Sequence, residues 1–234
     1  MTAAKVSRTV APDDDMYASG PDWYFEVGQS GLKNIKDAIG DRPVTSILDI
    51  PSGYGRVLRY LRAEWATADI VACDLNNKAV DFCAKEFDAI PLYSSTDFSE
   101  IKLDQTFDLI WCGSLLTHFD KRIWTDFFDF VIPRIRDKGT LVFTTHGRIA
   151  AHLAEQHNPV YGLTEGQFRI LVSDYQAEGF SYVNYSDDYP TYGISLTSAS
   201  WVMRFLEKFP TFKVTLFKEQ GWGHQDVYAF HKAW

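Results

Sequence analysis

Apolar and polar residues alternate along the chain in blocks that predict strands and helices. Short, nearly continuous apolar runs predict five buried strands, over residues 44–50, 69–74, 90–93, 106–112 and 140–145. Apolar residues at helical spacing predict helices over 56–65, 76–87, 124–135 and 148–157. Strands that alternate with helices in this way are typical of a parallel sheet covered on both faces.

Local signals place the ends of several of these helices. Pro133 lies inside the helical pattern of 124–135, so we expect a kink or a break there. Asn76 or Asn77 is expected to cap the helix over 76–87. A further helix is predicted over 164–179, because Thr164 and Gln167 occupy the positions of a capping box and a glycine ends the segment.

The last third of the chain has a different pattern. It predicts strands over 181–186, 212–217 and 226–231 and a helix over 201–209. The last two strands flank Gly221-Trp222-Gly223, and this turn predicts an antiparallel hairpin. The predicted fold class is therefore α/β, with a Rossmann-like, mostly parallel seven-stranded sheet that ends in a C-terminal antiparallel hairpin.

The chain divides into three predicted segments. Residues 1–15 are polar and are expected to be mobile. Residues 16–43 carry aromatic side chains and a helix that ends near Gly40, and they are expected to form a helical cap segment. Residues 44–234 are expected to form the main domain, which begins after Pro43.

Composition narrows the classes of function. The 234 residues carry a net charge of −8 without a run of lysine or arginine, which disfavours nucleic-acid binding. No apolar run is long enough to span a bilayer, and the N-terminus lacks a hydrophobic signal core. The three cysteines form no C-x-x-C pair and are expected to be buried and reduced. We therefore expect a cytoplasmic protein without nucleic-acid or membrane partners; its oligomeric state is left open.

Four groups of residues at predicted strand ends carry the candidate chemistry. The first is the glycine turn that follows the first strand, Asp49-Ile50-Pro51-Ser52-Gly53-Tyr54-Gly55. The second is Asp74, at the end of the second strand, where a carboxylate can accept hydrogen bonds from both ribose hydroxyls. The third is Asp97-Phe98, suited to an adenine edge, and the fourth is Cys112-Gly113, which a histidine follows five residues later.

Together, in this order and at this spacing, the four groups resemble the class I S-adenosylmethionine-dependent methyltransferase family over residues 44–146. The family's first motif, D-x-G-x-G-x-G, departs here at Pro51, which replaces the first glycine and cannot donate an N–H. The resemblance implies S-adenosylmethionine as cofactor and S-adenosylhomocysteine as product. It also implies a set of cofactor-binding residues: Asp49, Pro51, Gly53, Gly55, Asp74, Leu75, Asp97, Phe98, Cys112 and Gly113.

The resemblance implies a role for each part of this set. Asp49 and the Gly53–Gly55 loop would face the methionine end of the cofactor, and Asp74 would bind the ribose. Leu75 would pack on the adenine. Asp97 and Phe98 would hold its edge, and Cys112 and Gly113 would line the sulfonium end.

A narrower resemblance concerns the acceptor. The segments 49–59, 111–118, 143–147 and 223–227 are similar to bacterial methyltransferases associated with glycosyltransferases. This similarity implies a glycan acceptor, and small-molecule acceptors fit equally well. We expect O-methylation, for which a general base removes the hydroxyl proton.

Two histidines are the candidate catalytic bases. His118 follows the fourth strand and His146 follows the fifth, so both lie at the edge of the sheet where the methyl group is expected. A structural role is the alternative for each. His224 and Asp226 in the terminal hairpin are weaker candidates. No metal is expected, because these strand ends bring no set of carboxylates together.

Aromatic residues outside the motifs leave two interpretations open. Those that precede the main domain either close over the cofactor or pack an N-terminal helix; they are Tyr17, Trp23 and Tyr24. A second group suits either an acceptor pocket or ordinary packing: Tyr185, Tyr189, Tyr192 and Trp222.

Two other functions compete with methyl transfer. An NAD(P)-dependent oxidoreductase would carry G-x-G-x-x-G, but Leu58 stands where its third glycine belongs. A non-catalytic scaffold that binds S-adenosylmethionine would keep the same cofactor residues without turnover.

Overall fold

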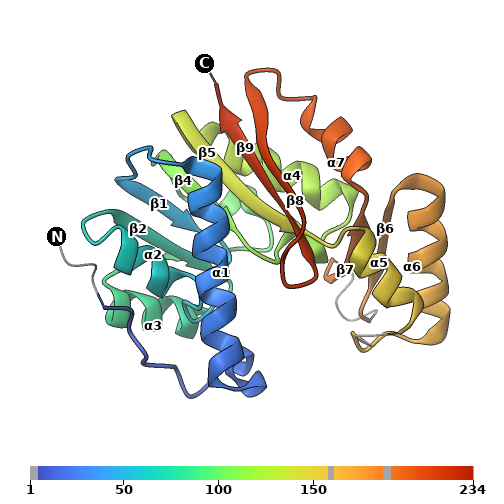
Figure 1. Ribbon diagram of the computed structural model, residues 1–234, viewed down its shortest axis with the longest axis horizontal. Coiled ribbons are helices and arrows are strands. Elements are labelled where there is room, and N and C mark those ends of the chain that lie inside the picture. The colour runs from blue at the N-terminus through green and yellow to red at the C-terminus, as the bar shows by residue number, and fades with distance from the viewer. Residues whose placement is uncertain (1–4, 158–160, 187–190, 234) are drawn as a thin grey trace.

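The computed structural model describes residues 5–157, 161–186 and 191–233. Its centre is a seven-stranded sheet of order β3-β2-β1-β4-β5-β9-β8 (Figure 1). The strands are β1 (Ser46–Asp49), β2 (Asp69–Asp74), β3 (Ile90–Tyr93), β4 (Phe107–Cys112), β5 (Ile135–Thr145), β8 (Phe212–Trp222) and β9 (Gln225–Lys232). The first five are parallel, whereas β9 runs antiparallel to β5 and to β8. The predicted fold class is confirmed.

Helices cover both faces of this sheet because successive strand residues point to opposite sides. Ile47 belongs to the apolar core under α1 (Pro21–Ile39), α2 (Leu58–Glu64) and α3 (Asn77–Phe87). Its neighbour Leu48 belongs to the core under α4 (Lys121–Val131) and α7 (Ala199–Leu206). Strands buried on both faces read as continuous apolar runs, which is why these runs were visible in the sequence.

Most predicted helix ends are confirmed. The Asn76 side chain caps α3, and Thr164 with Gln167 forms a complete capping box at α6 (Glu165–Glu178). Helix α4 ends at Val131, and Pro133 lies in the short 3-10 helix that follows. The prediction was wrong at Ile135, which begins β5 instead of ending a helix, because the proline stops the helical hydrogen bonds before it.

A second, two-stranded sheet was not predicted. The strand expected over 181–186 is β6 (Phe180–Asn184), but it pairs antiparallel with β7 (Gly193–Thr197) and does not join the main sheet. Helix α6 and α5 (Arg148–Glu155) pack with these strands around a separate apolar cluster. The pair lies beside the carboxyl-end edge of the main sheet (Figure 1).

The predicted segment boundaries at 15/16 and 43/44 stay predictions. Within the described part of the N-terminal segment, the carbonyl oxygens of Ser7 and Thr9 accept hydrogen bonds from the buried Arg59 guanidinium. Asp14 accepts one from the hydroxyl of Tyr24 in α1. Among the described residues, no helix combines the length and apolar character needed to cross a membrane.

Candidate active site

A cavity of about 170 Å³ opens at the carboxyl ends of β1, β2 and β4. These ends meet at one edge because the strands are parallel, and α/β sheets bind ligands at this edge. Five of the predicted cofactor residues line the cavity: Asp49, Pro51, Gly53, Asp74 and Gly113. The segments at the ends of β1 and β4 add Ser52, Tyr54, Arg56, Val57, Trp111 and Ser114 to its lining, and segments far away in the chain add Asp14, Met16 and Trp222.

Asp49 is the most unusual side chain of this cavity. Its exposed fraction is only 1%, and neither carboxylate oxygen has a hydrogen-bond partner among the described residues. Burial raises the pKa of this carboxyl well above its usual range, and the nearby charge of Asp74 raises it further. A buried carboxylate without donors is costly, so the site favours a ligand that brings positive N–H groups.

The glycine loop is bound to Asp74. The backbone N–H of Gly53 donates to Asp74 Oδ2 at 2.8 Å, and that of Asn76 donates to Oδ1 at 2.8 Å. Each carboxylate oxygen can accept a second hydrogen bond, so Asp74 retains capacity for two neighbouring hydroxyls. Gly55 has φ +77°, and a Cβ there would lie 2.4 Å from the Phe87 ring, so this position requires glycine.

His118 lies in a short 3-10 helix, η3 (Leu116–His118), after β4. Its Nδ1 is 2.8 Å from the carbonyl oxygen of Gly193 and 3.2 Å from the hydroxyl of Tyr185. A carbonyl only accepts, so Nδ1 carries the proton and Nε2 holds the lone pair that a base needs. The ring stacks on Tyr192 at 4.8 Å between centroids, and burial lowers the pKa of His118.

His146 follows β5 and is paired with His224 from the β8–β9 hairpin. Their Nε2 atoms are 3.2 Å apart, and the rings stack at 5.0 Å between centroids. The hydroxyl of Tyr161 lies 2.7 Å from the same nitrogen of His224. Burial lowers the pKa of His146 well below its usual value, and His224 and His118 lower it further. Burial also lowers the pKa of His224, so the neutral form is favoured in both imidazoles.

Sequence reasoning did not foresee this histidine pair or the hydrogen bonds beside it. The backbone N–H of Ser114 donates to Thr144 Oγ1 at 2.8 Å, and that hydroxyl donates to Gln225 Oε1 at 2.6 Å. The Gln225 amide donates back to Ser114 Oγ at 2.7 Å. These three hydrogen bonds form a closed ring that links the segment after β4 to β5 and β9. The ring fixes Ser114 at the wall of the cavity.

The comparisons with known proteins agree with this geometry. Residues 47–139 match the family model described as a methyltransferase domain. This match indicates a methyltransferase domain over residues 47–139. The matched region runs from β1 into β5 and includes the glycine loop, Asp74, Asp97 and His118.

Solved structures of other methyltransferases have the same fold. An S-adenosylmethionine-dependent methyltransferase from Clostridium acetobutylicum ATCC 824 has a TM-score of 0.59 and 12% identity, over 95% of this chain and 96% of that one. The 1,6-didemethyltoxoflavin-N1-methyltransferase of Burkholderia thailandensis, bound to its substrate and S-adenosylhomocysteine, has a TM-score of 0.60 and 14% identity, over 97% and 92%. The N-methyltransferase NodS from Bradyrhizobium japonicum WM9, bound to S-adenosylhomocysteine, has a TM-score of 0.56 and 13% identity, over 95% and 93%. No curated protein sequence matches the chain.

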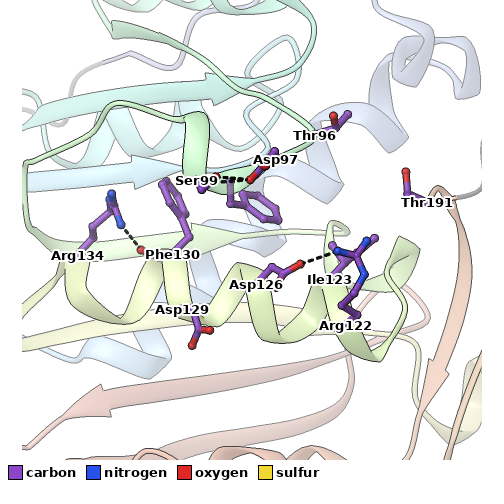
Figure 2. Close-up of a pocket in the computed structure, with 11 residues that line it drawn as sticks. Thr96, Asp97, Ser99, Arg122, Ile123, Asp126, Asp129, Phe130, Arg134 and Thr191 are labelled. Carbon is purple, nitrogen blue, oxygen red and sulfur yellow. Dashed lines mark hydrogen bonds and ion pairs between the residues drawn. The ribbon is translucent and has the colours of Figure 1, made fainter.

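The remaining predicted residues of the methyltransferase lie outside the 170 Å³ cavity. Asp97 and Phe98 line a second cavity, of about 550 Å³, between the 3-10 helix η2 (Phe98–Glu100) and α4 (Figure 2). Asp97 Oδ1 accepts from the backbone and hydroxyl of Ser99, and the Phe98 ring stacks in the core. Leu75 is 58% exposed beside a third hollow, and Cys112 is buried in the core.

The structure also shows where the weaker candidates for a catalytic role lie. Asp226 does not join His224; it lies against Gly147 and accepts from the backbone N–H of Gln220 at 2.9 Å. Burial raises the pKa of Asp226 to about 6. Tyr189 lies outside the described residues. Within the described part of the chain, no group of three or more histidines, cysteines and carboxylates is arranged to hold a metal ion.

Proposed function

We propose that this methyltransferase binds S-adenosylmethionine in the cavity at β1, β2 and β4 and O-methylates a small-molecule or glycan acceptor. The observation that carries the cofactor's place is the buried carboxylate of Asp49, which has no partner among the described residues and shares a cavity with Asp74. The cofactor carries an ammonium group, a donor of the kind that Asp49 lacks among the described residues. It also carries two ribose hydroxyls, which the remaining acceptor capacity of Asp74 can bind. When bound, S-adenosylmethionine supplies an activated methyl group on a sulfonium.

The proposed residue roles follow from the family resemblance; Asp49, Asp74 and Gly113 also share the 170 Å³ cavity. Asp49 accepts from the ammonium group, Asp74 accepts from the ribose hydroxyls, and Gly113 lines the sulfonium end. Leu75 and Asp97 flank the adenine from β2 and β3. Phe98 holds the adenine edge together with Asp97, and Cys112 lines the sulfonium end together with Gly113; both side chains are buried in the core.

Two neutral imidazoles favour a hydroxyl acceptor. A hydroxyl must lose its proton on methylation, and a general base with a free lone pair removes it. His118 and His146 follow β4 and β5, and His118 lies near enough to contribute to the lowered pKa of His146. His118 presents Nε2 as the lone-pair atom, and His146 has His224 as a partner that can receive or return a proton.

Three observations support the proposed acceptor class. The Burkholderia neighbour carries 1,6-didemethyltoxoflavin, a small molecule. The faces of Tyr185 and Tyr192 beside His118 suit the apolar face of a sugar or a planar ring. The similarity of the motifs to glycosyltransferase-associated enzymes favours the sugar.

Calorimetry tests the cofactor first. We expect S-adenosylmethionine and S-adenosylhomocysteine to bind and NADH not to bind. Asp74→Ala should weaken binding by about 1–3 kcal/mol, because it removes a charged acceptor. Asp41→Ala, which removes the same charge at an exposed turn, should bind as the unsubstituted chain does. Binding of NADH alone would support the oxidoreductase alternative.

An acceptor screen then tests the reaction. Sugar nucleotides, free glycosides and phenols are incubated with S-adenosylmethionine, and mass spectrometry detects the added methyl group. NMR of the product identifies the methylated atom. Saturable cofactor binding without product from any acceptor would favour the non-catalytic scaffold, and a methylated nitrogen would refute O-methylation.

A further inference from the structure

Tyr161 approaches the histidine pair from the connection between α5 and α6, and none of the predicted motifs includes it. Its ring centroid lies 5.7 Å from that of His146 and 6.2 Å from that of His224, so the three rings form one cluster. The backbone of Tyr161 has φ +50°, in the left-handed region that a bulky residue rarely occupies. Strain of this kind persists where the surrounding structure fixes a residue, and it gathers at functional sites. The tyrosine is therefore held against the histidines at a cost to its backbone.

The contact between Tyr161 and His224 has a preferred direction. Burial raises the pKa of the phenol to about 12, so the hydroxyl keeps its hydrogen at neutral pH. Its oxygen lies 2.7 Å from His224 Nε2, a usual length for a hydrogen bond from a hydroxyl. A phenol is a stronger acid than a neutral imidazole, and an imidazole nitrogen is a stronger base than a phenol oxygen. The favoured arrangement therefore has the hydroxyl donating to Nε2, with the hydrogen of His224 on Nδ1.

This arrangement constrains the next nitrogen of the cluster. His146 Nε2 lies 3.2 Å from the same nitrogen of His224, which then faces it with a lone pair. Two lone pairs at this distance repel each other, so His146 is favoured with its hydrogen on Nε2 and its lone pair on Nδ1. His146 Nδ1 is buried without a hydrogen-bond partner among the described residues. A lone pair without a donor costs less in such a place than an N–H without an acceptor.

The backbone carbonyl of Ser195 is a competing influence. It raises the pKa of His146, and a carbonyl oxygen prefers to face an N–H. If this carbonyl held a hydrogen on His146 Nδ1, His224 would carry its hydrogen on Nε2 and the phenol of Tyr161 would only accept. The three rings thus have two alternative patterns of hydrogens, and the donating hydroxyl of Tyr161 favours one of them.

We propose that Tyr161 is a positioning residue for His146: through His224 it fixes the tautomer in which His146 Nε2 carries the hydrogen and Nδ1 the lone pair. This role rests on the proposed function, in which His146 is a candidate base, whereas the tautomer can be measured without an acceptor. A proton taken up at Nδ1 lets the Nε2 hydrogen of His146 pass to His224. The hydroxyl of Tyr161 can then accept from the nitrogen that receives it, because a hydroxyl both donates and accepts.

NMR of isotope-labelled histidine nitrogens tests this role, because the nitrogen shift distinguishes an N–H from a lone pair. Spectra are recorded without ligand at about pH 8, above the usual histidine pKa, and His146→Gln and His224→Gln assign the signals. We expect the hydrogen on Nδ1 of His224 and on Nε2 of His146. Tyr161→Phe should shift the ratio of the two tautomers of each ring by roughly 2- to 10-fold toward the opposite pattern, as the loss of one hydrogen bond predicts.

A matched variant controls for the loss of a phenol hydroxyl. Tyr93 in β3 is half exposed and donates to Asp81, so Tyr93→Phe should leave both tautomers unchanged. A hydrogen on Nδ1 of His146 in the unsubstituted chain would overturn the proposed role of Tyr161, and so would tautomers that Tyr161→Phe leaves unchanged. Either result leaves the cofactor assignment standing. Failure of S-adenosylhomocysteine to bind would overturn the proposed function and leave the measured tautomers as they are.

Discussion

The indole of Trp222 lies edge-on to the indole of Trp111, with 5.3 Å between ring centroids and 85° between ring planes. Trp111 lies near the end of β4, in the middle of the sheet, whereas Trp222 ends β8, at its edge. The contact therefore reaches across β5 and β9 and brings the tip of the C-terminal hairpin to the cavity proposed to bind the cofactor. The last strands of the chain thus complete a site that the first strands begin.

Replacement of Trp222 should affect both stability and cofactor binding. Trp222→Ala removes a side chain that is only 5% exposed, and we expect a loss of about 3–5 kcal/mol in the free energy of unfolding. Trp222→Phe keeps an aromatic face for Arg56 and loses the hydrogen bond to Val27, so its loss should be smaller. Urea unfolding and calorimetry with S-adenosylhomocysteine measure the two effects. Wild-type cofactor affinity in a folded Trp222→Ala would exclude the indole from the site.

Gly28 should not tolerate a side chain. The methyl group of Gly28→Ala would meet the carbonyl oxygen of Arg56, and overpacking of this kind costs about 1–3 kcal/mol. Gly166 in α6 is the matched control, because the nearest atom to a Cβ there is Thr164 Oγ1 at 4.0 Å. Gly166→Ala should leave stability unchanged or raise it by up to about 1 kcal/mol. Thermal unfolding of the two variants checks this, and equal melting temperatures would contradict the close packing of α1 on Arg56.

Asp49→Asn should stabilise the protein without cofactor and weaken cofactor binding. The pKa of Asp49 is raised in the folded state by burial, so ionisation opposes folding at neutral pH, and an amide removes this opposition. The same change removes the negative charge proposed to bind the ammonium group, at a cost of roughly 10-fold or more in affinity. Melting temperatures at pH 7 with and without S-adenosylhomocysteine test both parts. A variant that binds the ligand normally would refute the proposed role of Asp49.

The carboxyl of Asp226 should make stability depend on pH. Its pKa is about 6 in the folded protein, mainly because of burial, against about 3.9 in an unfolded chain. The folded state therefore binds this proton more tightly, and the free energy of unfolding should fall by about 1–3 kcal/mol as pH rises from about 4 to about 6. Asp226→Asn keeps an oxygen for the N–H of Gln220 and should lack this decrease. Urea titrations between these pH values, for both proteins, give the difference directly; identical pH profiles would contradict the prediction.

The proposed base predicts the pH profile of turnover. A histidine base acts when it is neutral, and burial lowers the pKa of His118 and of His146. The rate should therefore be constant above about pH 6.5, the usual histidine pKa, and decrease only below it. Replacement of the true base by glutamine should lower kcat by about 10²- to 10⁴-fold. Steady-state kinetics of His118→Gln and His146→Gln identify it, and full activity in both variants would refute a histidine base.

Replacement of His224 tests whether its contact with His146 contributes to catalysis. If His146 is the base, His224→Gln should lower kcat less than His146→Gln does, because His224 acts through its contact with the His146 nitrogen. The inflection of the pH profile should also shift upward, since the charge of His224 is one of the influences that lowers the pKa of His146. An unchanged inflection would indicate that His146 is structural.

Local patterns in the sequence were sufficient to predict the central strands of the fold and those site residues that directly follow a strand. The strands β1 to β5 are buried on both faces and so appear as apolar runs, and Asp49, Gly53 and Asp74 follow directly from strand ends. Parallel strands bring their carboxyl ends to one edge, so the order of these motifs along the chain already implied a shared cavity. The capping box at Thr164 could likewise be predicted, because it depends only on residues close together in the sequence.

Tertiary structure decided the features that depend on residues far apart in the chain. The pairing of β6 with β7, the contact between His146 and His224, and the return of Trp222 to the cavity involve side chains with no local signal of their association. No local pattern shows that Asp49 is buried without a hydrogen-bond donor among the described residues, or that Arg56 faces a cavity. Periodicity and spacing determine which elements form, whereas packing of the completed chain determines which polar groups are left for a ligand.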